Sequence, residues 1–237
     1  MPNRAKGFLT TVMLAAAAVV VYAIFGAHFW HGFESLALLI IAVAASRLRL
    51  RLPGLTGNMS VNVPFILIAV VQLSLIEALM IGAASTLTQC FPKDGGRPKA
   101  TQMLFNISNA AVAVGIGNLI LRQAFVGGTV WTLKSLLPLA AASFFLAQTI
   151  PVATIISLTE GGSMLRIWSS IFHLSFPYYV LSADMASIVT TVSHRIGWQI
   201  PLLVLPVMYG VYRSYRLYFV RAAEAPQSIA LAKSASA

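Results

Sequence analysis

The sequence predicts an all-α fold, a polytopic transmembrane helical bundle, and three observations lead to it. Apolar residues make up 58% of the 237 residues, charged residues make up only 9%, and the mean hydropathy is +0.83. A soluble domain carries about 25% charged residues, so this chain could not cover a surface that faces water. The apolar residues also form continuous runs rather than the alternating pattern of a membrane β-barrel. Helices satisfy their backbone hydrogen bonds within one segment, as lipid requires.

Eight apolar stretches can be separated along the chain, within a range of six to eight spans. They lie at residues 8–28, 34–46, 61–75, 77–91, 102–121, 135–157, 172–192 and 198–215. With eight spans and the N-terminus inside, thirteen of the 16 Lys and Arg residues fall on the cytoplasmic side, and only Arg122, Lys134 and Arg195 fall outside. Basic residues concentrate on the cytoplasmic side of membrane proteins. We therefore expect a multi-pass protein of a bacterial inner membrane with both termini in the cytoplasm.

Residues 61–91 are the weakest part of this division. Two crossings there have only about 15 residues each, or about 22 Å of helix, against a hydrocarbon core of about 30 Å. Three interpretations stay open: short helices shielded by longer neighbours, a re-entrant pair, or one long tilted helix. Glu77 lies at the predicted junction, where we expect it at the outer surface as a cap of the second helix.

The chain is predicted to form one transmembrane domain over residues 1–220, followed by a short disordered cytoplasmic tail at 221–237. The loops at 47–60 and 92–101 are basic and rich in Gly and Pro. Arg47, Arg49 and Arg51 are predicted to lie at the inner membrane surface against anionic lipid, where each cation contributes about 1 kcal/mol of attraction. The net charge of +10 is explained by the orientation of the spans, and we expect no nucleic-acid partner.

Asp184 is the one acidic residue that the sequence places deep inside a span, at 172–192. It shares a helix face with His173, Pro177, Val180 and Ser187. Ionisable groups inside a membrane are costly and often functional. Two interpretations stay open, a polar pocket or proton site and a carboxyl group bonded to a neighbouring helix for packing. Both predict that Asp184 is buried in the bundle, where it is bonded to another helix or faces a polar cavity, rather than facing lipid.

A second polar stripe runs down the span at 102–121. Gln102, Asn106 and Asn109 are spaced i, i+4 and i+7 and fall on one face. Such amides bond across helices or bind the polar atoms of a ligand, and packing is the favoured interpretation. Together with Asp184 they form a predicted ligand-binding set, whose members are Asp184, Asn106, Asn109, Gln102, Gln148, Tyr178 and Ser182.

The sequence offers little for metal, cofactor or catalytic chemistry. His28, His31 and Glu34 share a face that a metal could use, but Phe29 and Trp30 lie between them, as in an interfacial aromatic belt. The single cysteine, Cys90, excludes an intramolecular disulfide and a cysteine metal cluster. No phosphate-binding loop or nucleophile–base pair is found. We expect no metal and no cofactor, and nothing argues for an enzyme.

Several short motifs are shared with a known group of proteins. Arg51-Leu52-Pro53-Gly54 is followed by Gly57, Ser60 and a membrane run to Glu77-Ala78; Leu104-Phe105-Asn106 and the segment from Tyr212 to Tyr218 continue the pattern. Over residues 8–220 the chain resembles the N-terminal membrane sensor region of bacterial signalling proteins with GGDEF or HD-GYP output domains. It is similar in style to the substrate-binding S-components of vitamin transporters. No output domain is expected after Tyr218, so the resemblance implies a separate partner for any signal.

The leading functional hypothesis is a non-enzymatic membrane sensor-like domain that binds a small or lipidic ligand in its helical bundle and signals through a separate protein. One alternative is a substrate-capture subunit of a membrane transporter. A less favoured one is a lipid-active membrane enzyme, with Asp184 and His173 as its polar pair. Membrane lipid, a small-molecule ligand and a protein in the membrane are thus the expected partners.

Overall fold

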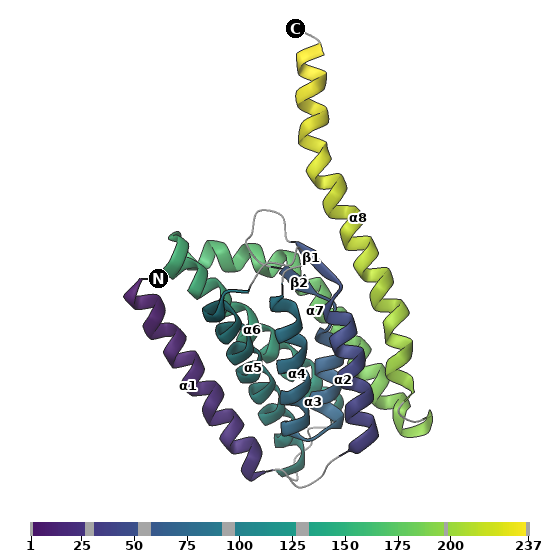
Figure 1. Ribbon diagram of the computed structural model, residues 1–237. Helices are drawn as coiled ribbons and strands as arrows, with labels where there is room; N and C mark the ends of the chain where they lie inside the picture. Colours follow the sequence, from purple (N-terminus) through teal and green to yellow (C-terminus); the bar gives the residue numbers. More distant parts are fainter. Residues whose placement is uncertain are drawn as a thin grey trace.

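The computed structural model describes residues 2–26, 31–51, 58–91, 98–126, 133–196 and 199–235. Within them the all-α prediction is confirmed, and each apolar stretch coincides with one helix (Figure 1). A pair of short antiparallel strands in the basic loop 47–60 was not predicted. The elements are α1 (Asn3–Phe25), α2 (Gly32–Ser46), β1 (Arg49–Arg51), β2 (Asn58–Ser60), α3 (Val63–Gln72), α4 (Leu75–Cys90), α5 (Ala100–Val126), α6 (Leu133–Glu160), α7 (Met164–Ile196) and α8 (Ile200–Ala235).

Side-chain contacts show that the first five helices alternate in direction. The rings of Phe8 and Phe105, near the starts of α1 and α5, are 6.4 Å apart. At the other ends of these helices, the Arg122 guanidinium lies 5.7 Å from the centre of the Tyr22 ring. The residue before α2, His31, contacts the first turn of α4. We call the end with the start of α1 and the strand pair the strand end, and the opposite end the Glu77 end (Figure 1).

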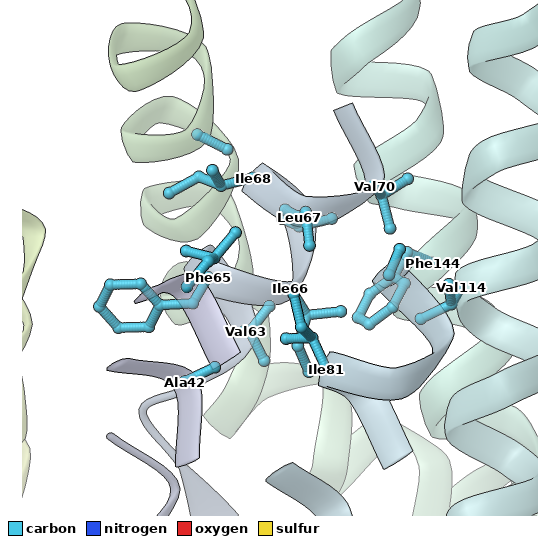
Figure 2. Packing of buried hydrophobic residues seen from close by; sticks show 14 of the residues in the cluster. Ala42, Val63, Phe65, Ile66, Leu67, Ile68, Val70, Ile81, Val114 and Phe144 are labelled. Atoms are coloured by element: carbon cyan, nitrogen blue, oxygen red, sulfur yellow. The ribbon is translucent and has the colours of Figure 1, made fainter. Parts of the chain in front are cut away.

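Helix α3 lies in the middle of the bundle. Every side chain from Val63 to Val70 is buried, and α3 packs against α2, α4, α5 and α7. Figure 2 shows Ile66 and Val70 of α3 beside Ile81 of α4 and Phe144 of α6. A helix that is hydrophobic all round belongs in a core, so α3 is a short helix shielded by longer neighbours. A single tilted helix over 61–91 is excluded, because the backbone is extended at Leu73, between α3 and α4.

Two details set the packing of the longer helices. A Cβ atom on Gly115 of α5 would lie 2.6 Å from Val19 of α1, so the two helices approach closely because this residue is glycine. Pro151 and Pro177 lie inside α6 and α7, and both helices continue through these residues. Neighbouring helices can re-satisfy the backbone groups that a proline frees.

Helix α8 contacts α2, α7 and β1 and then extends past the strand end, away from the rest of the bundle (Figure 1). The helix is assigned as far as Ala235, but the side chains after Tyr218 lie outside the described residues. The predicted division between a domain at 1–220 and a tail at 221–237 therefore stays a prediction.

By length and hydropathy, three helices in the described ranges can cross a membrane by themselves, fewer than the six to eight spans predicted. They comprise Asn3–Phe25, Ala100–Arg122 and Leu136–Glu160. Helices α2, α3 and α4 are apolar but shorter.

Candidate functional site

The amide stripe of α5 is bonded to α6 at one point, Asn109. Its Nδ2 donates to the backbone carbonyl of Gln148 at 3.0 Å and to Gln148 Oε1 at 2.7 Å. Asn109 is buried, and its Oδ1 has no hydrogen-bond partner among the described atoms. The helical turn that it contacts contains Pro151, which lacks an N–H and leaves α6 one backbone bond short. The pair thus joins two helices and retains one buried acceptor for a further donor.

The other two amides of the stripe lie nearer the strand end. Asn106 Nδ2 donates to Cys90 Sγ at 3.7 Å, which links the start of α5 to the end of α4. Gln102, one turn earlier, is exposed. The favoured interpretation of the stripe as interhelical packing agrees with these contacts for Asn106 and Asn109.

An aromatic cluster joins α6 to α7 beside the Asn109–Gln148 pair. Thr149, the neighbour of Gln148, accepts a hydrogen bond from Trp168 Nε1 at 3.2 Å. Phe145, one turn earlier on α6, has its ring 5.6 Å from Phe172 and 4.7 Å from Tyr179 of α7. Aromatic pairs at such distances add to the burial of apolar area.

Both ends of the buried helix α3 are bonded to α7. The Tyr178 hydroxyl accepts a hydrogen bond from the backbone N–H of Val63 at 3.2 Å and thereby satisfies one of the free donors at the start of α3. At the end of α3, Gln72 Nε2 donates to Ser193 Oγ at 2.7 Å. Ser182 is buried, and its hydroxyl donates to the Tyr178 carbonyl of its own helix. Helices α3 and α7 therefore run in the same direction, and a shift of one would be felt by the other.

Glu77 caps the second helix of the broken pair, as predicted. It is 1% exposed and forms a capping box with Ser74, whose backbone N–H and hydroxyl donate to Glu77 Oε2 at 3.0 and 2.6 Å. His31 contributes two more contacts: its backbone N–H donates to Oε1 at 2.8 Å, and its Nδ1 lies 3.0 Å from Oε2. These contacts join His31, the residue before α2, to the break between α3 and α4. The Ser-x-x-Glu spacing is the sequence signal of such a cap.

The histidine-bearing face at residues 28–34 is paired differently from its spacing in the sequence. His31 pairs with Glu77 rather than with Glu34, and His28 lies outside the described residues. No group of three His, Cys, Asp or Glu side chains within the described ranges could hold a metal ion.

The prediction that Asp184 is buried in the bundle is wrong. The side chain is exposed, and it makes no hydrogen bond or ion pair with any described residue. Asp184 shares a face of α7 with His173, Pro177 and Val180, as predicted. All of these residues are exposed, so that face points away from the bundle. The orienting contact of His173 is with its own helix, at the carbonyl of Ser169. The buried face of α7 is occupied by Tyr178 and Ser182, and this leaves Asp184 on the opposite side.

Two residues of the predicted lipid-binding cluster have described side chains. Arg47 is exposed, whereas Arg49 Nη2 donates to the backbone carbonyl of Thr88 at 2.7 Å. The last carbonyls of a helix have no intrahelical partner, so Arg49 caps the end of α4. The side chain of Arg51 lies outside the described residues.

The predicted ligand-binding set is thus divided into separate groups. Asn109 and Gln148 are in contact, Asn106 contacts Cys90, Ser182 is bonded to Tyr178, and Asp184 and Gln102 are exposed elsewhere. The bond between Gln72 and Ser193 was missed, because neither its partner nor its register can be derived from spacing within one helix.

Comparison with known families shows which family the chain belongs to. The model of the family described as MASE9 matches residues 3–219, nearly the whole chain. The chain belongs to the MASE9 family. This is a family of membrane-associated sensor domains, and the match covers all eight helices except the last part of α8. Comparisons with curated proteins and with solved structures found no match.

Proposed function

We propose that this MASE9 domain spans a bacterial inner membrane eight times, binds a small or lipidic ligand within the bundle, and signals to a separate protein through α8. The family and the apolar helices support a membrane sensor. The number of crossings, the cytoplasmic position of both termini, the ligand and the partner are parts of the proposal.

The alternating helices and the charges support eight crossings. The strand end carries exposed basic side chains at Arg4, Lys6, Arg47 and Lys99, whereas Arg122 lies at the Glu77 end. Basic residues favour the cytoplasmic side, so we assign the strand end to the cytoplasm. The short helices α2, α3 and α4 would cross where longer neighbours shield them. Of the two cluster side chains that the structure describes, Arg47 is the exposed one that can contact anionic lipid, since Arg49 is bonded to Thr88.

The observation that carries the proposal is the position of α3. This short helix is buried among its neighbours and is bonded at both ends to α7. Helix α8 is the next element of the chain after α7. Broken and short helices at mid-membrane often mark binding sites. A ligand that displaced α3 or its neighbours would also displace α7, and α8 would carry that movement past the strand end.

We assign the polar contact with the ligand to the Asn109–Gln148 pair. Its free buried acceptor, Asn109 Oδ1, suits a ligand with a hydroxyl or N–H donor, and the apolar surroundings suit a lipid-soluble one. A buried acceptor without a partner is costly, so a donor in that position would stabilise the folded state.

Ligand binding is tested by thermal unfolding of the full chain in nanodiscs. The probe is a total lipid extract of a bacterial inner membrane, and nanodiscs of synthetic phosphatidylcholine are the reference. We expect the extract to raise Tm for the native chain and for Gln102→Ala, which changes an exposed amide of the same helix. Asn109→Ala should lose the increase. An equal response of all three chains would reject the Asn109 site, and no response of the native chain would reject a lipid ligand from this source.

Topology is tested separately by reporter fusions after Lys6 and after Arg221. Both reporters should lie on the cytoplasmic side. Reporters on opposite sides would mean an odd number of crossings and would end the eight-span proposal.

The broken pair α3–α4 also favours a second candidate, a substrate-capture subunit of a transporter, because transporters build sites from interrupted helices. The two candidates differ in their partner. A transporter subunit would accumulate its ligand across vesicle membranes only with an energising ATPase, whereas a sensor would accumulate nothing in either case.

A further inference from the structure

Asp184 and Arg213 are opposite charges at the same depth on neighbouring helices. Asp184 is 12 residues before the last residue of α7, Ile196, and Arg213 is 13 residues after the first residue of α8, Ile200. At 1.5 Å per residue these positions are about 18 and about 20 Å from the α7–α8 connection. The contacts of α7 with α3 give the same depth for Asp184, which lies between Tyr178 at the start of α3 and Ser193 at its end.

Each charge is exposed on an apolar helix face. Four residues before and after Asp184 lie Val180 and Ile188, which are 44% and 55% exposed. Tyr209 and Leu217 flank Arg213 with the same spacing and are 50% and 51% exposed. Neither charged side chain makes a hydrogen bond or an ion pair with a described residue. These faces of α7 and α8 are therefore exposed in the single chain.

Both charges lie toward the cytoplasmic ends of their proposed spans, where an ionisable side chain that faces lipid is normally paired. We propose that a second copy of this chain covers these faces in a two-fold symmetric dimer, in which Asp184 of each copy pairs with Arg213 of the other. In a two-fold interface the contact of residue i with residue j is repeated as j with i, so one geometry satisfies all four charges. The proposal rests on the proposed crossing of the membrane by α7 and α8.

Charge reversal tests the pair directly. Full chains labelled at the N-terminus are reconstituted in phosphatidylcholine vesicles, and association is measured by energy transfer. Asp184→Arg alone brings two like charges together, as does Arg213→Asp alone, and we expect each to self-associate at least about tenfold more weakly than the native chain. A mixture of the two variants places opposite charges at both contacts and should recover native association. As controls, Glu34→Arg and Arg166→Asp change exposed charges on other surfaces and should have no effect.

Cross-linking provides a measurement that does not need a charge variant. In a Cys90→Ala background, chains with Ile188→Cys are mixed with chains with Tyr209→Cys, which lie at matching depths of α7 and α8. Oxidation should join the two chains covalently. Ile188→Cys mixed with Leu14→Cys, on the exposed face of α1, should give no such product.

Three results would overturn the proposal. The first is a native chain that stays monomeric in vesicles, and the second is single variants that associate as the native chain does. The third is a mixture of the two single variants that does not associate, together with a double variant, Asp184→Arg and Arg213→Asp in one chain, that does. The last result would place the pair inside one molecule. None of these measurements depends on the reporter fusions, so a failed dimer and a failed topology are distinguishable.

Discussion

Glu77 and Asp184 are two carboxylates on helices of the same bundle, and their surroundings are opposite. Glu77 is 1% exposed and has contacts with Ser74 and His31 at both oxygens. Asp184 is exposed and has no described partner. The difference follows from position along the helix. The first turn of a helix has free N–H groups, which Glu77 and Ser74 use, whereas the N–H groups around Asp184 are already bonded within α7. A carboxylate in a membrane helix is therefore inexpensive to bury at the helix start and expensive in the middle.

Removing the Glu77 carboxylate should have the largest effect on stability. Glu77→Ala removes the charge-assisted hydrogen bonds that the backbone N–H groups of His31 and Ser74 donate to the carboxylate, which contribute about 1.5–3 kcal/mol each. We expect a loss of about 3 kcal/mol or more in the free energy of unfolding, measured by titration with dodecyl sulfate in mixed micelles. Ser74→Ala is the matched variant and should lose only about 1 kcal/mol, because the bonds to His31 remain. Equal losses for the two variants would contradict this account of the cap.

Overpacking at Gly115 gives a loss of unfolding free energy that can be compared with the loss at Glu77. Gly115→Ala would place a Cβ atom 2.6 Å from Val19 and push α1 away from α5. Overpacking of this kind costs about 1–3 kcal/mol. Gly117→Ala, two residues later, meets Val70 at an ordinary 3.6 Å and should be close to neutral in the same unfolding titration. A neutral Gly115→Ala would show that α1 can move without cost.

Tyr178 allows a test of capping by a neutral group from another helix. Tyr178→Phe keeps the buried ring but leaves the Val63 N–H at the start of α3 without its acceptor. We expect a loss of about 1–2 kcal/mol, smaller than for Glu77 because one neutral bond is removed. Tyr209→Phe removes an exposed hydroxyl and serves as the control. A loss of the same size for both variants would remove the capping role of Tyr178.

The sequence was sufficient for the features that depend on local patterns. Continuous apolar runs predicted each helix, and the Ser-x-x-Glu spacing at Ser74 indicated the cap of α4. It was insufficient where the outcome depends on which face of a helix meets a neighbour. Asp184 was expected inside because ionisable groups in membranes usually face the bundle, but Tyr178 and Ser182 occupy the inner face of α7. The bond of Arg49 to Thr88 and the strand pair join residues distant in sequence, and no periodicity predicts such pairs.

Replacing Asp184 should have the smallest effect on the stability of a single chain. Asp184→Leu removes no described hydrogen bond and fills no buried space, so the free energy of unfolding should change by no more than about 0.5 kcal/mol in dilute mixed micelles. Asn109→Leu, which breaks the bonds to Gln148, serves as the contrast and should lose about 0.6 kcal/mol or more. The measurement is made at low protein concentration, where association between chains does not contribute. A loss above about 2 kcal/mol for Asp184→Leu would mean that Asp184 has a partner within its own chain. It would then resemble Glu77, and the contrast between the start and the middle of a helix would not explain their difference.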